Sequence, residues 1–332
     1  MASGRTILVT GGAGFVGSHL VERLLARGDE VTVVDDLSTG RASNLDAARA
    51  IAGDRLACIT ARVSEAESGL GARRFHEVYH LAAAVGVRRV LDHPLESIET
   101  NVLETGAALR IAEACGASFL LASSSEVYGK SPAVPFRESD DMVFGPTSVT
   151  RWSYGCSKAI DEYMTLAKGR QGGMRVVVAR LFNTVGSRQQ GRWGMVLPRF
   201  VEAAIAGRPL EVHGDGRQSR CFADVRDVSA GLVALLGCAT AHGSVFNIGS
   251  DRPISIRALA ERVIAVTGSR AGLVLLPYQD ALPEGFEDLA ARQPDLSRIR
   301  GAIGFEAAIP LDRTISDLVA EVRASGAEGR AA

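Results

Sequence analysis

The sequence contains few cysteines, and their spacing fits neither a disulfide framework nor a metal site. Five occur among 332 residues, at Cys58, Cys115, Cys156, Cys221 and Cys238. An odd number of scattered cysteines, without the close pairs that bind zinc, predicts free thiols in a reducing compartment. We therefore expect a cytoplasmic protein that holds no metal.

The sequence also lacks an excess of one charge and any long apolar run. Its 37 basic and 38 acidic residues give a formal net charge of −1. Without a broad basic field, neither nucleic acid nor an anionic membrane surface is an expected partner. No stretch approaches the ~20 apolar residues of a membrane span. The first apolar run, residues 6–9, is too short for a signal peptide and fits a strand instead.

A glycine-rich turn close to the start of the chain is the first positive signal. The run 6–9 predicts a buried parallel strand, and residues 18–27 carry apolar side chains at helical spacing. Gly11 permits a tight turn, Gly14 lets backbone N–H groups approach a pyrophosphate, and Gly17 lets the helix pack on the strand. The pattern predicts the phosphate-binding turn of a dinucleotide-binding βαβ unit.

An acidic residue at the end of the next predicted strand indicates which dinucleotide is bound. Residues 30–34 predict a strand that ends at Asp35, 24 positions after Gly11. A carboxylate there can accept hydrogen bonds from both ribose hydroxyls of the adenosine and would repel a 2′-phosphate. We therefore expect NAD rather than NADP.

Predicted strands and helices alternate along most of the remaining chain. Strands are expected near 55–60, 77–81, 118–122, 174–180, 210–213, 221–223 and 244–248, and helices near 94–114, 152–169, 198–207, 225–238, 256–267 and 314–324. This alternation predicts an α/β fold with a doubly wound parallel sheet. We expect a dinucleotide-binding Rossmann domain over residues 1–182, with returning segments near 214–247. Residues 183–332 are expected to form mainly a smaller substrate lobe.

Tyr154 and Lys158 lie four positions apart and therefore on one face of a predicted helix. A Lys ammonium beside a phenol favours the phenolate and lowers a pKa that is ordinarily near ~10. Tyr154 can then take a proton from a substrate hydroxyl while a hydride leaves the same carbon. Ser124, at the end of the predicted strand 118–122, would hydrogen-bond that hydroxyl.

Further motifs follow the glycine turn in a fixed order. They are His80-Leu81-Ala82-Ala83, Ser124, Tyr154-x-x-x-Lys158, the stretch 180–186 (RLFNTVG) and the stretch 214–220 (GDGRQSR). With Asp35, these motifs closely resemble those of the extended short-chain dehydrogenases/reductases that act on nucleotide sugars. The resemblance covers nearly the whole chain.

The resemblance implies NAD as cofactor, a UDP-sugar as substrate and a homodimer formed through the helices 94–114 and 152–169. The cofactor-binding residues that it implies are Gly11, Gly14, Phe15, Val16, Gly17, Asp35, Asp36, Ser38, Gly40, Val63, Leu81, Ala82, Ala83, Asn101, Tyr154 and Lys158. The substrate-binding residues that it implies are Asn183, Val196, Arg199 and Arg220. Two positions depart from the family pattern. Arg62 stands where an Asp usually contacts adenine and cannot accept its amine, and Ser187 replaces the usual Pro after Gly186.

The residues beside Ser124 distinguish among the reactions of the resembled family, which share oxidation of the sugar at C4. Dehydratases carry Asp-Glu where this chain has Ser125-Glu126. Ser-Glu is similar to UDP-glucuronate decarboxylases, which also have an Arg-x-Pro-Asp segment, matched here by Arg292 to Asp295. The catalytic residues implied are Ser124, Ser125, Glu126, Tyr154, Lys158 and Arg292. In this set Arg292 seats the carboxylate and Glu126 relays the C5 proton.

We therefore expect an NAD-dependent decarboxylase that converts UDP-glucuronate to UDP-xylose, UDP-4-keto-xylose or both. A UDP-glucose or UDP-glucuronate 4-epimerase is the alternative within the family. A non-catalytic dinucleotide-binding regulator is an alternative of another class, and the intact set of Ser124, Tyr154 and Lys158 argues against it. Glu126 can also be read as a structural acid and Arg292 as half of a surface salt bridge.

Overall fold

A seven-stranded parallel sheet forms the centre of the protein in the computed structural model, which describes residues 4–84, 86–191, 195–277 and 289–331. Its strands, in the spatial order β11-β6-β5-β4-β1-β2-β3, all pair in parallel. They are β1 (Thr6–Thr10), β2 (Glu30–Asp35), β3 (Leu56–Thr60), β4 (Glu77–His80), β5 (Ser118–Ser124), β6 (Val176–Leu181) and β11 (Ser244–Ile248). The order reverses between β1 and β4, where doubly wound folds bind their ligands. The predicted α/β fold is confirmed.

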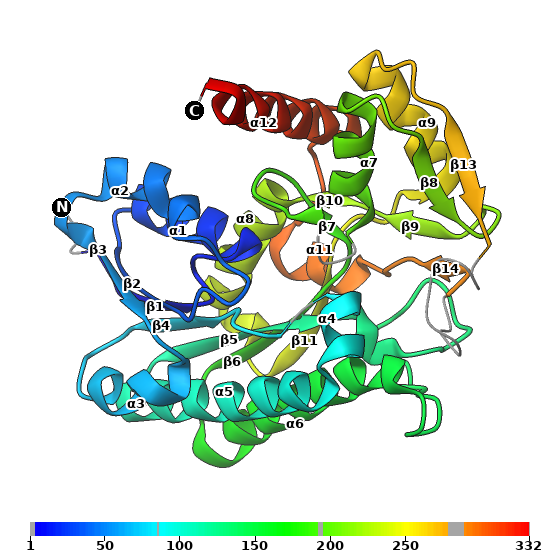
Figure 1. Ribbon diagram of the computed structural model, residues 1–332. Coiled ribbons are helices and arrows are strands. Elements are labelled where there is room, and N and C mark those ends of the chain that lie inside the picture. The colour runs from blue at the N-terminus through cyan, green and yellow to red at the C-terminus, as the bar shows by residue number, and fades with distance from the viewer. Residues whose placement is uncertain (1–3, 85, 192–194, 278–288, 332) are drawn as a thin grey trace.

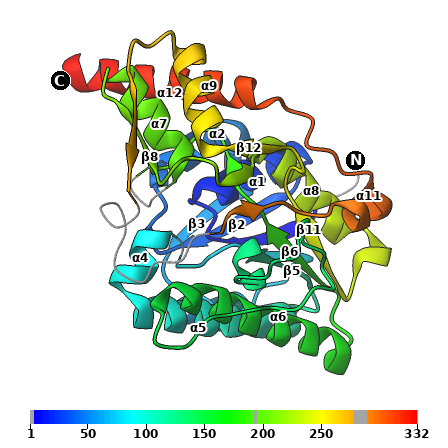
Figure 2. The same cartoon turned by 90° about the vertical axis from the view of Figure 1, so that its right-hand side faces the viewer.

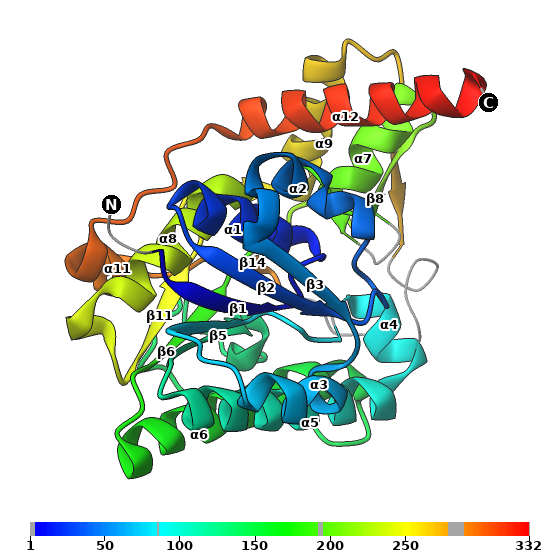
Figure 3. The ribbon, with the colours of Figure 1, turned by 90° about the vertical axis from the view of Figure 1, so that its left-hand side faces the viewer.

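Helices cover both faces of this sheet (Figure 1, Figure 3). One face carries α1 (Phe15–Ala26), α2 (Asp46–Ala52) and α8 (Val225–Gly237), and the other carries α3 (Val63–Gly71), α5 (Pro94–Cys115) and α6 (Ser153–Gly172). Each face has its own apolar core, with Leu24 and Leu232 in one and Ile111 and Phe119 in the other. Because both faces are buried, the strands are almost continuously apolar, as in residues 7–9.

A second group of elements has an apolar core of its own. It contains α7 (Val196–Ile205), α9 (Ile256–Thr267), α12 (Leu311–Ala331), β8 (Leu210–His213), β13 (Leu273–Leu276), β9 (Ser219–Cys221) and β12 (Pro253–Ser255). Phe200, Leu259 and Leu318 belong to its core. Figure 2 shows this group on the opposite side of the sheet from α5 and α6. We call it the substrate lobe. The domain boundaries expected from the sequence stay predictions.

The chain does not stay in the substrate lobe after entering it. α8 packs on α1, β11 joins the large sheet beside β6, and α11 (Ser297–Ile303) packs on β11 before α12 returns to the lobe. α12 is longer than the expected helix 314–324. None of the helices in the described parts of the chain combines the length and apolarity needed to cross a bilayer.

The expected strand at 221–223 is wrong, because one strand ends at Cys221 and a second, with a different pairing partner, begins at Ala223. β9 (Ser219–Cys221) pairs with β12 (Pro253–Ser255) and β14 (Ala291–Arg292), whereas β10 (Ala223–Asp224) pairs with β7 (Thr184–Val185). The pairing of β14 with β9 sets Arg292 opposite Arg220.

The segment after β14 is also hydrogen-bonded to the loop that follows β5 of the large sheet. The Phe136 N–H donates to the Gln293 carbonyl at 2.8 Å, and the Asp295 N–H donates to the Phe136 carbonyl at 2.8 Å. Residues 291–295 therefore connect the substrate lobe to the loop that follows β5.

Candidate functional site

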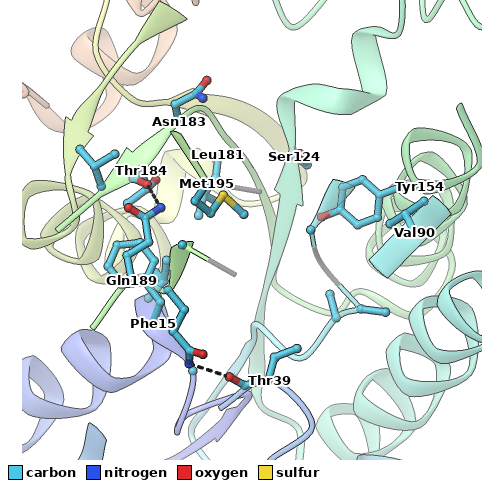
Figure 4. Close-up of a pocket in the computed structure, with 18 of the residues that line it drawn as sticks. Phe15, Thr39, Val90, Ser124, Tyr154, Leu181, Asn183, Thr184, Gln189 and Met195 are labelled. Atoms are coloured by element: carbon cyan, nitrogen blue, oxygen red, sulfur yellow. Dashed lines mark hydrogen bonds between the residues drawn. The ribbon is translucent and has the colours of Figure 1, made fainter. Parts of the chain in front are cut away.

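A cleft of about 1380 Å³ runs along the carboxyl ends of the parallel strands and is walled on its other side by the substrate lobe. Figure 4 shows that its lining comes from both parts of the molecule, with Phe15 and Thr39 at one end and Ser124 and Tyr154 at another. This position is where the strand order reverses, so the fold itself places the cleft where ligands bind.

The glycine turn forms one end of the cleft and has a shape that only glycine permits. Gly11 adopts a φ of +69°, and a Cβ on Gly17 would lie 2.1 Å from the Gly11 carbonyl oxygen. No side chain caps the first turn of α1, whose N-cap residue is Gly14. Its N–H groups are therefore available to an anion, and the turn fits the pyrophosphate of a dinucleotide.

Asp35 lies at the end of β2, beside this turn. Its carboxylate accepts the Ala13 and Leu37 N–H groups, each at 2.9 Å. Burial raises the pKa of Asp35, and these two hydrogen bonds oppose the rise. A Cβ on Gly40 would lie 2.9 Å from the carboxylate, so Gly40 leaves room for it.

Most of the expected cofactor-binding residues line the cleft. Besides Asp35 they are Gly11, Gly14, Phe15, Val16, Gly17, Asp36, Ser38, Val63, Leu81, Ala82, Ala83 and Tyr154. Gly40, Asn101 and Lys158 lie behind this lining. Asn101 accepts the Ala84 N–H and donates to Ser157, both at 2.9 Å, so it ties the end of β4 to α6. Arg62 lines the cleft at the end of β3.

Tyr154 and Ser124 meet in the cleft, as the sequence predicts (Figure 4). The pKa of Tyr154 is nevertheless raised above its usual range, first by burial and then by the charge of Glu126, while a hydrogen bond with Ser124 opposes the rise. The direction of this shift is opposite to the one that the sequence predicts for the residues alone, because burial outweighs the other influences. Lys158 Nζ donates to Asp161 Oδ2 at 2.9 Å, which offsets part of its charge.

A cluster of three charged side chains lies next to Tyr154. Glu126 is bound by Arg292 Nη1 at 2.6 Å and by Arg151 Nη2 at 2.7 Å. Burial alone would raise the pKa of Glu126, but the two guanidinium groups hold it at about 2. We call these three residues the carboxylate cluster. Glu126 and Arg292 therefore meet, and Arg292 is not a surface residue, since its side chain is 9% exposed.

The expected substrate residues lie on the lobe side of the cleft. Asn183, Val196, Arg199 and Arg220 all line it. Arg220 is oriented by its own backbone surroundings, since its Nη1 donates to the Ser219 and Leu289 carbonyls at 2.7 and 2.9 Å. Asn183 lies two residues after the end of β6, so the end of the large sheet and the lobe both contribute to the lining of the cleft.

Comparison with known proteins agrees with this geometry. The model of a family described as the NAD dependent epimerase/dehydratase family matches residues 7–249. The chain belongs to this family. NAD is accordingly its cofactor, and the shape of the glycine turn and the position of Asp35 fit a dinucleotide.

Individual family members are similar over almost the whole chain. A UDP-N-acetyl-alpha-D-glucosaminuronate decarboxylase of Bacillus cytotoxicus is 35% identical over 94% of this chain and 96% of its own length. UDP-glucuronic acid decarboxylase 1 of Danio rerio is 34% identical over 95% of this chain and 72% of its own. The solved structure of a UDP-glucose 4-epimerase with UDP-glucose, from Thermotoga maritima, is 27% identical with a TM-score of 0.84, covering 96% of this chain and 99% of that one.

Sequence reasoning missed three residues of the site. Arg151 completes the carboxylate cluster, and its position three residues before Tyr154 was the available signal. Gln189, labelled in Figure 4, and its neighbour Gln190 also line the cleft. Gln190 donates to the Thr39 carbonyl at 3.2 Å and accepts from Arg41 Nη2 at 3.2 Å. No residue pattern in this loop pointed to such contacts.

Proposed function

We propose that this protein oxidises C4 of UDP-glucuronate with NAD and then releases the C6 carboxyl group as CO₂. The observation that carries the proposal is the carboxylate cluster beside Tyr154, in which two arginines share one acidic residue. The decarboxylase names of the relatives that cover nearly the whole chain support it.

The first step is oxidation at C4. Tyr154 takes the proton of the C4 hydroxyl as general base, and Ser124 holds that hydroxyl by a hydrogen bond. NAD, when bound, takes up the hydride from C4 and can return it to the keto sugar. Because Ser124 and Tyr154 both line the cleft, one substrate oxygen can contact both.

The second step is cleavage of the bond between C5 and C6. The ketone at C4 makes the acid a β-keto acid, and the electrons of the broken bond pass into the enolate of C4 and C5. The C–C bond must stand perpendicular to the ketone plane, and a guanidinium fixes a carboxylate through paired hydrogen bonds. Arg292, with Arg151 beside it, is placed for this task.

The third step is protonation of C5 in the enolate. Glu126 has a pKa of about 2 between its two arginines and carries no proton there. A substrate carboxylate that shares those guanidinium groups raises the pKa of Glu126, because two like charges at close range disfavour each other. Glu126 thus takes a proton from water while the substrate carboxylate is bound, and passes it to C5 after that group has left as CO₂.

The test of this function is incubation of the protein and NAD with UDP-glucuronate, followed by NMR of the sugar and measurement of CO₂. The expected products are CO₂ with UDP-xylose, UDP-4-keto-xylose or both. A parallel incubation with UDP-N-acetylglucosaminuronate tests the same chemistry on a substrate substituted at C2. Formation of UDP-galacturonate without CO₂ would show a 4-epimerase, the activity named for the similar Thermotoga maritima protein.

We also propose a cytoplasmic homodimer that is joined through α5 and α6. These helices pack side by side (Figure 2). Each exposes large apolar side chains to solvent. Leu95 and Leu103 of α5 are 67% and 62% exposed, and Ile160 and Tyr163 of α6 are 45% and 63% exposed. All five cysteines are free, which fits a reducing compartment.

Light scattering at micromolar protein tests the assembly. We expect twice the mass of one chain, because a twofold contact is the commonest closed assembly. Leu103→Glu should yield single chains, since it places a charge in the proposed contact. Glu30→Lys, on the exposed start of β2, is the control and should leave the dimer intact. A wild-type protein that scatters as a single chain would refute the assembly.

A further inference from the structure

Lys158 and Asp161 form a closed ion pair behind Tyr154. Lys158 Nζ lies 2.9 Å from Asp161 Oδ2, and their side chains are 1% and 0% exposed. The two residues are three positions apart on α6, so the helix itself brings them together. This carboxylate has no part in the steps described above. Its location raises the question of what an acid buried against the lysine of the catalytic pair does.

The charge of Asp161 acts on Tyr154 as well as on Lys158. An anion in contact with a cation offsets part of the field of that cation at a third group, so Lys158 favours a phenolate at Tyr154 less than a lone lysine would. The charge of Asp161 is indeed one of the causes that raise the pKa of Tyr154. Burial raises the pKa of Asp161 itself, and Lys158 is the largest influence that opposes this rise.

The other ionisable groups near the pair are either neutral or already paired. His80 of β4 is fully buried and hydrogen-bonds to Thr10 and Thr105. Burial and the charge of Lys158 lower its pKa to about 3, so it is neutral. Thr105 and Asn101 are the uncharged side chains of α5 on this side.

The remaining charges are held by partners of their own. Glu162, next to Asp161 on α6, is bound by Arg180 of β6 at 2.7 Å. Glu104 of α5 accepts the Ser64 N–H and hydroxyl. Glu126 belongs to the carboxylate cluster, and burial raises the pKa of the Cys156 thiol. Asp161 is thus the acid that directly contacts Lys158.

We propose that Asp161 is a positioning residue that holds Lys158 by its ammonium group and, by offsetting the charge of that group, sets the pH range in which Tyr154 works as the base. This inference deepens the proposed function, since it rests on Tyr154 being the base of the C4 oxidation. It assigns a role to a residue that touches neither the substrate nor the reacting atoms. The pH profile of the oxidation therefore depends on three residues of α6, which are Tyr154, Lys158 and Asp161.

The decisive variant is Asp161→Asn, which separates charge from position. The amide oxygen still accepts a hydrogen bond from Lys158, but the negative charge is gone. The positive field at Tyr154 then increases, and an unbalanced charge at close range shifts a pKa by ~1–3 units. We expect the acid limb of the pH–rate profile for NADH formation to move down by about 1 pH unit, with NAD affinity by calorimetry nearly unchanged.

Two controls separate this role from a merely structural one. Asp161→Glu keeps the charge and should leave the acid limb within a few tenths of a unit of wild type. Glu113→Gln removes the acid of an exposed pair between α5 and α6, in which Lys168 Nζ lies 2.7 Å from Glu113. It should not move the limb. If the acid limb of the pH–rate profile of Asp161→Asn stays in place or moves to higher pH, the proposal is overturned.

A second measurement does not depend on turnover. The tyrosinate absorbance of the NAD complex is titrated for wild type and Asp161→Asn, with Tyr154→Phe as the blank for the other tyrosines. The Tyr154 signal should form at lower pH in Asp161→Asn, and equal titrations overturn the proposal. If Asp161→Asn does not fold by circular dichroism, Asp161→Ser takes its place with the same expected shift. If wild type forms neither NADH nor CO₂ from UDP-glucuronate, the proposed function fails while this titration still decides the role of Asp161.

Discussion

The two charged groups that flank Tyr154 differ in their access to the cleft. Lys158 and Asp161 pair with each other and are sealed from the cleft. In the carboxylate cluster, Glu126, Arg151 and Arg292 all line the cleft. A sealed ion pair cannot contact a ligand, whereas guanidinium groups that line the cleft can bind one more carboxylate. In the proposed function, the pair of Lys158 and Asp161 sets the pH range in which Tyr154 works, and the carboxylate cluster binds the carboxylate of the substrate.

The largest expected effect comes from removing the group that stands between the two. Tyr154→Phe should lower the rate of NADH formation from UDP-glucuronate by ~10²–10⁴-fold, because the phenol carries the proton. NAD and UDP-glucuronate should still bind, as calorimetry can show, since both charged groups remain. Near-normal turnover would mean that Tyr154 is not the base of the oxidation.

The second prediction concerns the pH dependence of stability that the carboxylate cluster creates. Glu126 has a folded-state pKa of about 2, against 4.5 for an ordinary Glu, and this shift corresponds to about 3 kcal/mol. The folded pKa is depressed, so the stabilisation is present above pH 4.5 and is lost as the pH falls toward 2. Urea unfolding of wild type and Glu126→Gln at several pH values should show their stability difference changing over this window. A difference that is constant with pH would contradict the ion pairs of Glu126.

The third prediction tests whether the open cluster orients the substrate. Arg292→Lys keeps the charge but loses the planar fork that binds a carboxylate through two hydrogen bonds. Misplacement of this kind can cost ~10²-fold, so CO₂ release should fall by about that factor while NAD binding is unchanged. Arg298→Lys, an exposed arginine of the same part of the chain, is the matched control. If CO₂ release in Arg292→Lys equals wild type, Arg292 does not orient the carboxylate.

The smallest effect is a preference in binding. With turnover blocked in Tyr154→Phe, UDP-glucuronate should bind about tenfold more tightly than UDP-glucose, because hydrogen bonds to charged groups contribute ~1.5–3 kcal/mol. The preference should shrink in the double variant that adds Arg292→Met. Calorimetry with both nucleotide sugars measures it. Equal affinities would show that the arginines of the cluster do not recognise the sugar's carboxylate.

Structural features formed by residues close together in the sequence were predicted best. The turn of Gly11, Gly14 and Gly17 and the helical spacing of Tyr154 and Lys158 depend on local geometry, and the structure shows both as expected. The doubly wound parallel sheet followed from the alternation of strands and helices, because parallel strands need crossover connections. The roles of the individual site residues stay predictions.

Contacts between distant segments were harder to foresee. The cluster joins Glu126 with Arg292, 166 positions away, and the resemblance implied both residues but not their contact. Arg151 completes the cluster, and its position three residues before Tyr154 places it near the site without showing that it contacts Glu126. The pairing of Lys158 with Asp161 was visible as a three-residue spacing, yet spacing alone does not say that burial forces the two together. The partner change after Cys221 was hidden for a similar reason, since short strands are chosen by tertiary pairing.

The attachment of residues 291–295 on both sides has a mechanical consequence. This segment is paired to β9 of the substrate lobe and hydrogen-bonded to Phe136 beyond β5. Arg292 therefore sits on a tether between the two parts that enclose the cleft. If the lobe swings outward far enough to strain this tether, Arg292 is drawn away from Glu126, and the carboxylate cluster comes apart. The motion that opens the cleft would then also separate Arg292 from Glu126. An open protein would therefore admit nucleotide sugars before the carboxylate cluster that distinguishes among them is assembled.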